Sequence, residues 1–173
     1  MKKTKWIDRK FPPIEDNGIL PSIIERLDGT PLRLEANVML STPELLILKP
    51  DNKWSIKEHI GHLGDLEPLG LGRLDDFFIG LPELRAADMS NRKTDEANYN
   101  AIEVSVLLNE FRMQRDILVA RLRGMTEKDL LISSVHPRLK TPMRIIDLAF
   151  FIAEHDDHHL ASISEIRINY LKK

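Results

Sequence analysis

The stretches Trp54-Ser-Ile-Lys-Glu-His59-Ile-Gly-His62-Leu-Gly-Asp65 and Glu154-His155-Asp-Asp-His158-His159-Leu160 hold five of the chain's six histidines in two tight groups. Imidazole is the commonest metal ligand among protein side chains, and helix positions three or four residues apart lie on the same face. Two such groups, far apart in the sequence, are what a metal site between two facing helices would require. The alternative is that both groups lie on solvated helix faces, so the helix geometry has to decide.

Composition restricts the class of protein. The chain has 173 residues, 42% of them hydrophobic and 30% charged, as in an ordinary globular protein with one domain. Cysteine is absent, which excludes disulfides, zinc–thiolate sites and a cysteine nucleophile. The basic start of the chain lacks the apolar run of a signal peptide, and no stretch approaches the roughly 18 apolar residues of a membrane helix. We therefore expect a cytoplasmic protein with no membrane partner.

The charge distribution argues against a nucleic-acid partner. The net charge is −2, and 25 basic and 27 acidic side chains are interspersed along the chain. Nucleic-acid binders instead concentrate a basic excess on one face. One run of arginines is mixed with acidic residues and is interpreted as a solvated helix face; it comprises Arg112, Arg115, Arg121 and Arg123.

Prolines and turn residues divide the chain into four long helical blocks. Ser55, with Glu58 three residues later, has the pattern of a capping box, and Gly124 follows the third block as a typical helix stop. The predicted helices are 20–41, 55–79, 101–123 and 143–171, with a short extra turn at 126–129 and polar loops at 83–100 and 133–142. These blocks predict an all-α four-helix bundle, and the loop at 83–100 is long enough for a crossover connection. The predicted division is an N-terminal arm, 1–17, followed by the bundle domain, 18–173.

Helical periodicity places the late histidines on an apolar face. With about 100° per residue on the last helix, His155 and His159 fall inside one apolar stripe and His158 lies at its edge. A buried neutral histidine needs partners for both ring nitrogens, and two in one stripe are hard to satisfy by hydrogen bonds alone. A shared metal would satisfy both. On the second helix the same test slightly favours His59 over His62 as the inward residue.

Taken together, the histidine stretches resemble the DinB/YfiT-like superfamily of four-helix proteins. The resemblance rests on Trp54 ahead of a His-Leu-x-Asp element, on the late His-x-x-x-His pair and on a His-Pro loop before the last helix, and it spans 19–173. It implies that one histidine of the second helix and two of the fourth bind a divalent metal. Carried onto this chain, the ligands are His62, His155 and His159. The family pattern therefore favours His62 where periodicity favours His59.

The resemblance implies a catalytic site, because three histidines leave coordination positions open for water or substrate. Nitrogen ligands accept nickel, zinc, iron or manganese, and the sequence does not choose among them. The candidates for a catalytic or supporting role are Asp65, Asp156 and His59. A helix-capping or solvated role is favoured for Asp65 and Glu67, while Asp156 projects near the apolar stripe and is the better support for a ligand. His158 is expected at the surface.

The resemblance also implies two classes of activity on small-molecule substrates. The favoured class is thiol-dependent S-transfer or isomerisation, in which the metal activates a low-molecular-weight thiol such as bacillithiol, mycothiol or glutathione. The alternatives are hydrolysis of an amide or ester by metal-activated water, and a non-catalytic metal-binding module of a stress response.

A homodimer is expected, because bundles of this family commonly associate. Trp6, Phe11 and Pro12-Pro13 form an apolar arm that would pack on a partner or fold back on its own bundle.

Overall fold

The structure is a computed structural model that describes residues 4–170. The first three residues of the predicted arm and the predicted helix end at Leu171 lie outside these residues. No helix within 4–170 combines the length and the apolar character that crossing a membrane requires.

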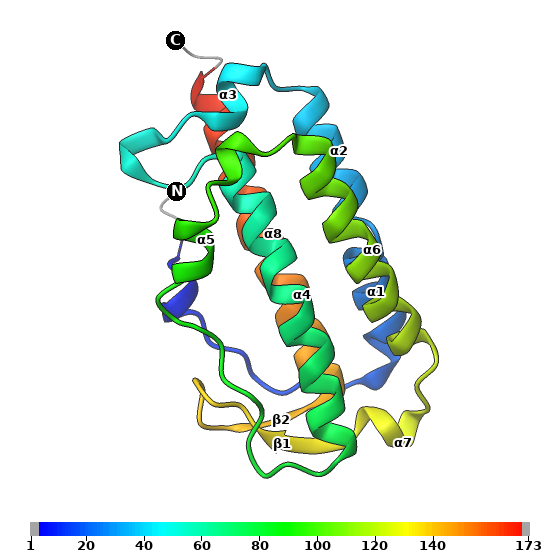
Figure 1. The fold of residues 1–173 in the computed structure, drawn as a ribbon. Coiled ribbons are helices and arrows are strands. Elements are labelled where there is room, and N and C mark those ends of the chain that lie inside the picture. The colour runs from blue at the N-terminus through cyan, green and yellow to red at the C-terminus, as the bar shows by residue number, and fades with distance from the viewer. Residues whose placement is uncertain (1–3, 171–173) are drawn as a thin grey trace.

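The chain forms a four-helix bundle with a long crossover connection, as predicted (Figure 1). Its helices are α1 (Leu20–Asp28) with α2 (Thr30–Met39), α4 (Ile56–Phe78), α6 (Val104–Arg123) and α8 (Ile145–Tyr170). In Figure 1 the α1–α2 pair and α8 run upward, whereas α4 and α6 both run downward. The connection between α4 and α6 therefore returns along the whole bundle, and this return brings residues of the connection beside α4.

The first bundle helix is interrupted, which corrects the single helix predicted for 20–41. Pro31 has no N–H to donate to the preceding turn, and the chain breaks at Gly29 into α1 and α2. The Leu27 carbonyl, which Pro31 leaves without a helix donor, accepts instead from Arg115 at 3.1 Å. After Met39 a further short helix, α3 (Pro43–Ile47), begins with Thr42 as its N-cap, and the sequence did not predict it.

The other helix ends follow the sequence more closely. Ser55 caps α4, accepting from the Glu58 backbone N–H, while the Glu58 carboxylate accepts from the Ser55 backbone N–H, so the predicted capping box is confirmed. The 3₁₀ turns η1 (Trp6–Asp8) and η2 (Asn17–Ile19) precede α1. The connections contain α5 (Arg92–Glu96), α7 (Glu127–Leu130) and the 3₁₀ turns η3 (Pro50–Asn52) and η4 (Tyr99–Ala101).

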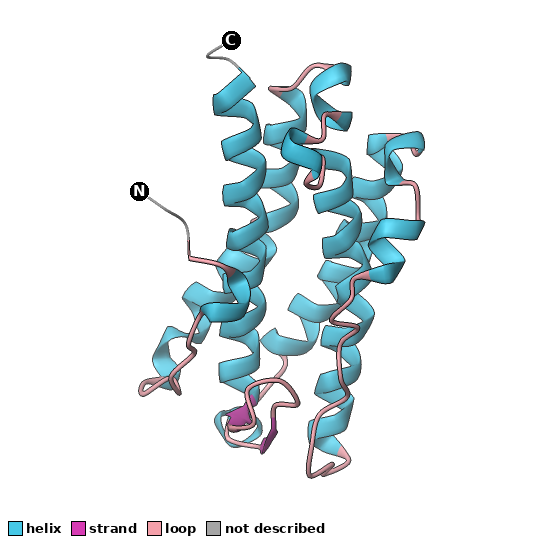
Figure 2. Ribbon diagram, turned by 90° about the vertical axis from the view of Figure 1, so that its left-hand side faces the viewer, coloured by secondary structure: helices cyan, strands magenta, loops and turns pink. Residues whose placement is uncertain are grey.

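A two-stranded sheet replaces part of the loop predicted at 133–142 and the first two residues of the helix predicted at 143–171, which begins at Ile145. β1 (Ser133–Val135) and β2 (Pro142–Arg144) pair antiparallel, with Ser134 opposite Met143. Figure 2 shows them at the end of the bundle where α8 begins. The hairpin that joins them contains His136, Pro137 and Arg138, which return below as residues of a cavity.

Two apolar clusters form the core, one in each half of the bundle. One is built around Leu27, Phe77 and Leu118, and the other around Leu34 and Phe111. Each cluster receives side chains from all four bundle helices. The helix segments between the two clusters carry polar and charged side chains, so the bundle has a polar layer at mid-height.

Arg115 is the centre of this polar layer, and its burial corrects the prediction of a solvated arginine face. The side chain is 0% exposed and bonds Glu67 of α4 at 2.6 Å and also Asp156 of α8. Thr30 of α2 completes the layer by donating to Asp156 at 2.8 Å. Burial alone lowers the pKa of Arg115, but the two carboxylates more than offset it, so the pKa is raised and the guanidinium stays charged.

The N-terminal arm folds back on its own bundle, the second of the two alternatives left open by the sequence. The centroid of the Trp6 ring lies 5.1 Å from that of Phe11 and 5.0 Å from that of Phe151 of α8. The arm therefore gives no support to a homodimer, which stays a prediction.

Candidate metal centre

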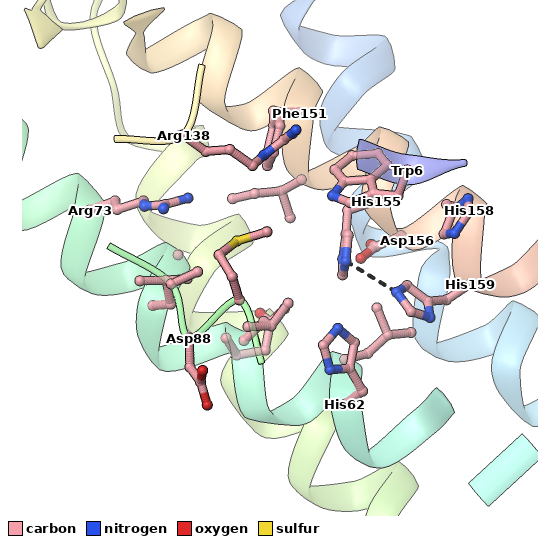
Figure 3. Close-up of a pocket in the computed structure, with 18 of the residues that line it drawn as sticks. Trp6, His62, Arg73, Asp88, Arg138, Phe151, His155, Asp156, His158 and His159 are labelled. Carbon is pink, nitrogen blue, oxygen red and sulfur yellow. Dashed lines mark hydrogen bonds between the residues drawn. The ribbon is translucent and has the colours of Figure 1, made fainter. Parts of the chain in front are cut away.

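Three histidines from two helices converge at mid-height of the bundle. His62 of α4 and His155 and His159 of α8 each offer one ring nitrogen, and these three nitrogens lie within 4.8 Å of one another. Figure 3 shows the three rings pointing toward one another, with a dashed line between His155 and His159. Their Nε2 atoms are 3.1 Å apart. The family resemblance implied that these side chains lie close together although their helices are distant along the chain.

The spacing of one nitrogen pair and the protonation of all three rings fit a divalent ion. An ion about 2.0–2.1 Å from each imidazole nitrogen requires roughly 3–3.5 Å between the nitrogens, so the His155–His159 pair is already at the right separation. Burial lowers the pKa of His62 to about 4. Burial, followed by the neighbouring histidines, also holds the pKa of both His155 and His159 well below the ordinary value. All three rings are therefore neutral at pH 7 and keep a lone pair for a ligand bond.

A chain of hydrogen bonds fixes the tautomer of His62. Its Nδ1 lies 3.0 Å from the Thr94 hydroxyl of α5, and that hydroxyl donates to Asp65 at 3.2 Å. Because the only hydroxyl hydrogen goes to Asp65, Thr94 must accept from His62 Nδ1–H, which leaves Nε2 of His62 without a hydrogen and with its lone pair available. Asp65 also accepts from Tyr99 at 2.6 Å and pairs with Lys93 at 2.8 Å. The predicted solvated role of Asp65 is thus wrong.

His59 lies behind the group of three. Its Nδ1 is 2.8 Å from Nδ1 of His159, on the side of that ring away from His155. One of the two Nδ1 atoms must donate to the other, and a hydrogen on Nδ1 of His159 leaves its Nε2 free of hydrogen beside His155. The structure therefore places His62, and not His59, in the group of three, as the family pattern implied and helical periodicity did not.

The remaining candidates have other partners. Both oxygens of Asp156 accept from Arg115, and one also accepts from Thr30. Glu67 is 3% exposed and pairs with the same arginine, which corrects its predicted solvated or capping role. His158 was predicted at the surface, but it is half-buried beside Trp6, and the centroids of the two rings are 5.8 Å apart.

A cavity of about 430 Å³ opens beside the three histidines. Trp6 and Trp54 line it near the histidines, and apolar side chains of α4, α6 and α8 form much of its wall. Arg73, His136 and Arg138 also line it, and sequence reasoning did not identify any of them as site residues. The one feature of the sequence that could have identified His136 as a site residue is the His-Pro element, which forms part of the family resemblance. The arrangement gives a small molecule access to whatever the three imidazoles hold.

Comparisons with known proteins agree with this fold. Residues 26–163 match the family model of the DinB superfamily. Among solved structures the chain is similar to YfiT from Bacillus subtilis, with a TM-score of 0.80, 20% sequence identity, and coverage of 94% of this chain and 95% of YfiT. YfiT is described as a probable metal-dependent hydrolase with an unusual four-helix bundle topology. A comparison with curated proteins found no match. With most of the chain covered by the family match, this protein belongs to the DinB superfamily.

Proposed function

We propose that this protein is a divalent-metal-dependent enzyme for small-molecule substrates, with His62, His155 and His159 as metal ligands. The main support is the convergence of three neutral imidazole nitrogens within 4.8 Å at the wall of a cavity. Three protein ligands leave coordination positions open, as in catalytic sites. When bound, the divalent ion would act as a Lewis acid that lowers the pKa of a thiol or water in contact with it.

We assign thiol-dependent S-transfer or isomerisation as the reaction class. The carboxylates that line the cavity are Glu67, Asp88 and Asp156. Glu67 and Asp156 are bound to Arg115, and Asp88 accepts from backbone N–H groups. Attack by water is helped by a general base, whereas a thiol that contacts a divalent ion loses its proton without one. A cavity whose carboxylates are already occupied therefore favours a thiol nucleophile, and the thiol must be a cosubstrate because the chain has no cysteine.

Hydrolysis of an amide or ester is the second candidate. The observation in its favour is the description of YfiT as a probable metal-dependent hydrolase. Water in contact with a divalent ion has a pKa lowered to about 7, so a separate general base is helpful but not required. In this case the same three histidines would hold the ion, and the substrate would enter without a thiol.

The first test is the metal content of untagged protein by mass spectrometry. We expect about one divalent ion per chain, lost in His62→Ala and in His155→Ala. His59→Ala is the comparison variant, because it removes the hydrogen-bond partner of His159 and no ligand, so it should lose less metal than either ligand variant. Retention in His62→Ala with loss in His59→Ala would show that the assignment of His62 is wrong. A wild-type protein that takes up none of nickel, zinc, iron or manganese would refute the proposal.

The reaction class is tested on the metal-loaded protein. Conjugation of 1-chloro-2,4-dinitrobenzene is measured with bacillithiol, mycothiol or glutathione, and hydrolysis of p-nitrophenyl esters and anilides is measured without a thiol. We expect conjugation with at least one thiol, abolished in His155→Ala. Hydrolysis alone would establish the second candidate, and a metal-loaded protein inactive in both assays would favour the non-catalytic metal-binding module.

A further inference from the structure

One end of the cavity is cationic. Arg73 of α4, with His136 and Arg138 of the β1–β2 hairpin, lines the cavity there, and we call these three residues the arginine end. Figure 3 shows Arg73 and Arg138 across the cavity from His62 and His159. All three side chains line the same cavity, and their electrostatics agree with that placement, because Arg138 lowers the pKa of Arg73 and both arginines lower that of His136.

The arginine end carries hydrogen-bond donors without protein acceptors. Within residues 4–170, Arg73 is 5% exposed and donates through Nε alone, to the Arg85 carbonyl at 3.1 Å. Nη2 of Arg138 and Nε2 of His136 are buried and have no hydrogen-bond partner among the described residues. His136 is 2% exposed, and its Nδ1 accepts two backbone N–H groups of the hairpin, so the ring hydrogen sits on Nε2. Buried donors without acceptors are costly and call for a ligand.

Among the described residues, Asp76 offsets part of the positive charge of this end. It raises the pKa of Arg73, but both of its oxygens are hydrogen-bonded to Arg85, so it makes no hydrogen bond to Arg73 or Arg138. Burial lowers the pKa of Arg73 to about 10 and also lowers that of Arg138, so both remain protonated at pH 7. Asp88 lines the cavity too, but Figure 3 shows its carboxylate directed away from both arginines.

The open donors match a carboxylate. Neither Nη atom of Arg73 donates to a described residue, and Nη2 of Arg138 and Nε2 of His136 add two buried donors that lack acceptors, whereas a carboxylate only accepts. Guanidinium groups suit such planar oxyanions. Between the arginine end and the histidines the wall is largely apolar, including Leu148, Phe151 and Ile152.

From these observations we propose that the arginine end binds the carboxylate of a small organic acid, whose apolar part extends along the cavity toward the three histidines. The substrate or the thiol cosubstrate of the proposed reaction is then a carboxylic acid. This last step rests on the proposed function, whereas carboxylate binding at the arginine end does not.

The test compares hexanoate with its neutral analogue hexanamide by isothermal titration calorimetry on the full chain as purified. Charge-assisted hydrogen bonds lead us to expect hexanoate to bind about tenfold tighter or more. In Arg73→Gln and in Arg138→Gln the preference should fall below about threefold. Arg123→Gln is the matched control, because that arginine is 51% exposed on α6 and pairs with Asp28 outside the cavity, and it should keep the preference. Circular dichroism during thermal unfolding confirms that each variant is folded.

The same titration on His62→Ala separates this proposal from the metal centre. That variant should bind no metal and yet retain the preference for hexanoate. Loss of the preference there would show that the carboxylate binds the metal, which would overturn the proposal even if the metal site itself is correct. No preference in the wild type, or a preference that survives in both Arg73→Gln and Arg138→Gln, would also overturn it. Hexyl phosphate binding tenfold tighter than hexanoate would show that the site takes phosphate and not carboxylate.

Discussion

The hydroxyl of Thr94 is predicted to set the affinity of the metal centre without touching the metal. It accepts from Nδ1 of His62 at 3.0 Å and donates to Asp65 at 3.2 Å, and the side chain is 2% exposed. Thr94→Val keeps the shape of the side chain but removes both hydrogen bonds. His62 can then rotate or place its hydrogen on Nε2, where it would block a ligand bond. Losing such a support lowers metal affinity by about 10–100-fold, or roughly 1.4–2.8 kcal/mol.

The assay is a zinc titration of metal-stripped protein in competition with a chromophoric chelator at pH 7. Thr94→Ser retains the hydroxyl and should bind within about threefold of the wild type. Thr126→Val is a control for the substitution itself, because Thr126 caps α7 at an exposed position and should leave zinc affinity unchanged. If folded Thr94→Val binds zinc as tightly as Thr94→Ser does, the hydrogen-bond chain does not support the site and our reasoning about it is refuted.

Other predictions concern packing and titration in the same region. The new Cβ of Gly61→Ala would lie 2.5 Å from the Tyr99 ring, so the free energy of unfolding in urea should fall by about 1–3 kcal/mol. At Gly64 on the same helix an added Cβ would meet no atom within 4 Å, so Gly64→Ala should instead raise the free energy of unfolding by about 0.5–1 kcal/mol. Equal effects of the two substitutions would contradict the close contact between Gly61 and Tyr99. Arg115→Met leaves two buried carboxylates unpaired and should cost about 3–5 kcal/mol, most of it regained when both carboxylates are also changed to amides. The pKa of His136 is lowered from 6.5 to about 4 by burial and by nearby arginines, so the unfolded chain takes up the proton first as the pH falls. The contribution of neutral His136 to stability is therefore complete above about pH 6.5 and is lost as the pH falls toward 4. In His136→Gln the free energy of unfolding should depend less steeply on pH, with a slope reduced by at most about 1.4 kcal/mol per pH unit.

The two helices differ in how well periodicity located their histidines, and the reason lies in the spacing of the candidates. On α8, His155 and His159 are four residues apart and lie about 40° apart around the helix, so one stripe holds both. On α4, His59 and His62 are three residues apart and lie about 60° apart, so both lie near the same apolar stripe. Periodicity alone cannot choose between two such neighbours. Only the family pattern distinguished His62 from His59.

The polar layer escaped prediction for a related reason. The environment of a charged residue is set by partners on other helices, and the sequence does not distinguish Arg115 from the exposed Arg123 of the same helix. Its two carboxylate partners, Glu67 and Asp156, come from α4 and α8. Each of the three would be costly to bury alone, so none can be recognised as buried without the others. The cationic residues of the cavity were missed similarly, because Arg73 meets His136 and Arg138 only once the hairpin has folded.

The crossover connection links these findings, because it supplies part of the support for the metal centre. The segment predicted as a loop at 83–100 returns along the bundle and lays Thr94 and Tyr99 against α4, where both contact Asp65. That approach depends on Gly61, since any Cβ there would overlap the Tyr99 ring. A glycine directly before His62 therefore lets the connection come close enough to fix the imidazole through Thr94. The position of the connection and the orientation of His62 thus depend on the same close contact, which is why a change at Gly61 should disturb the metal centre as well as the fold.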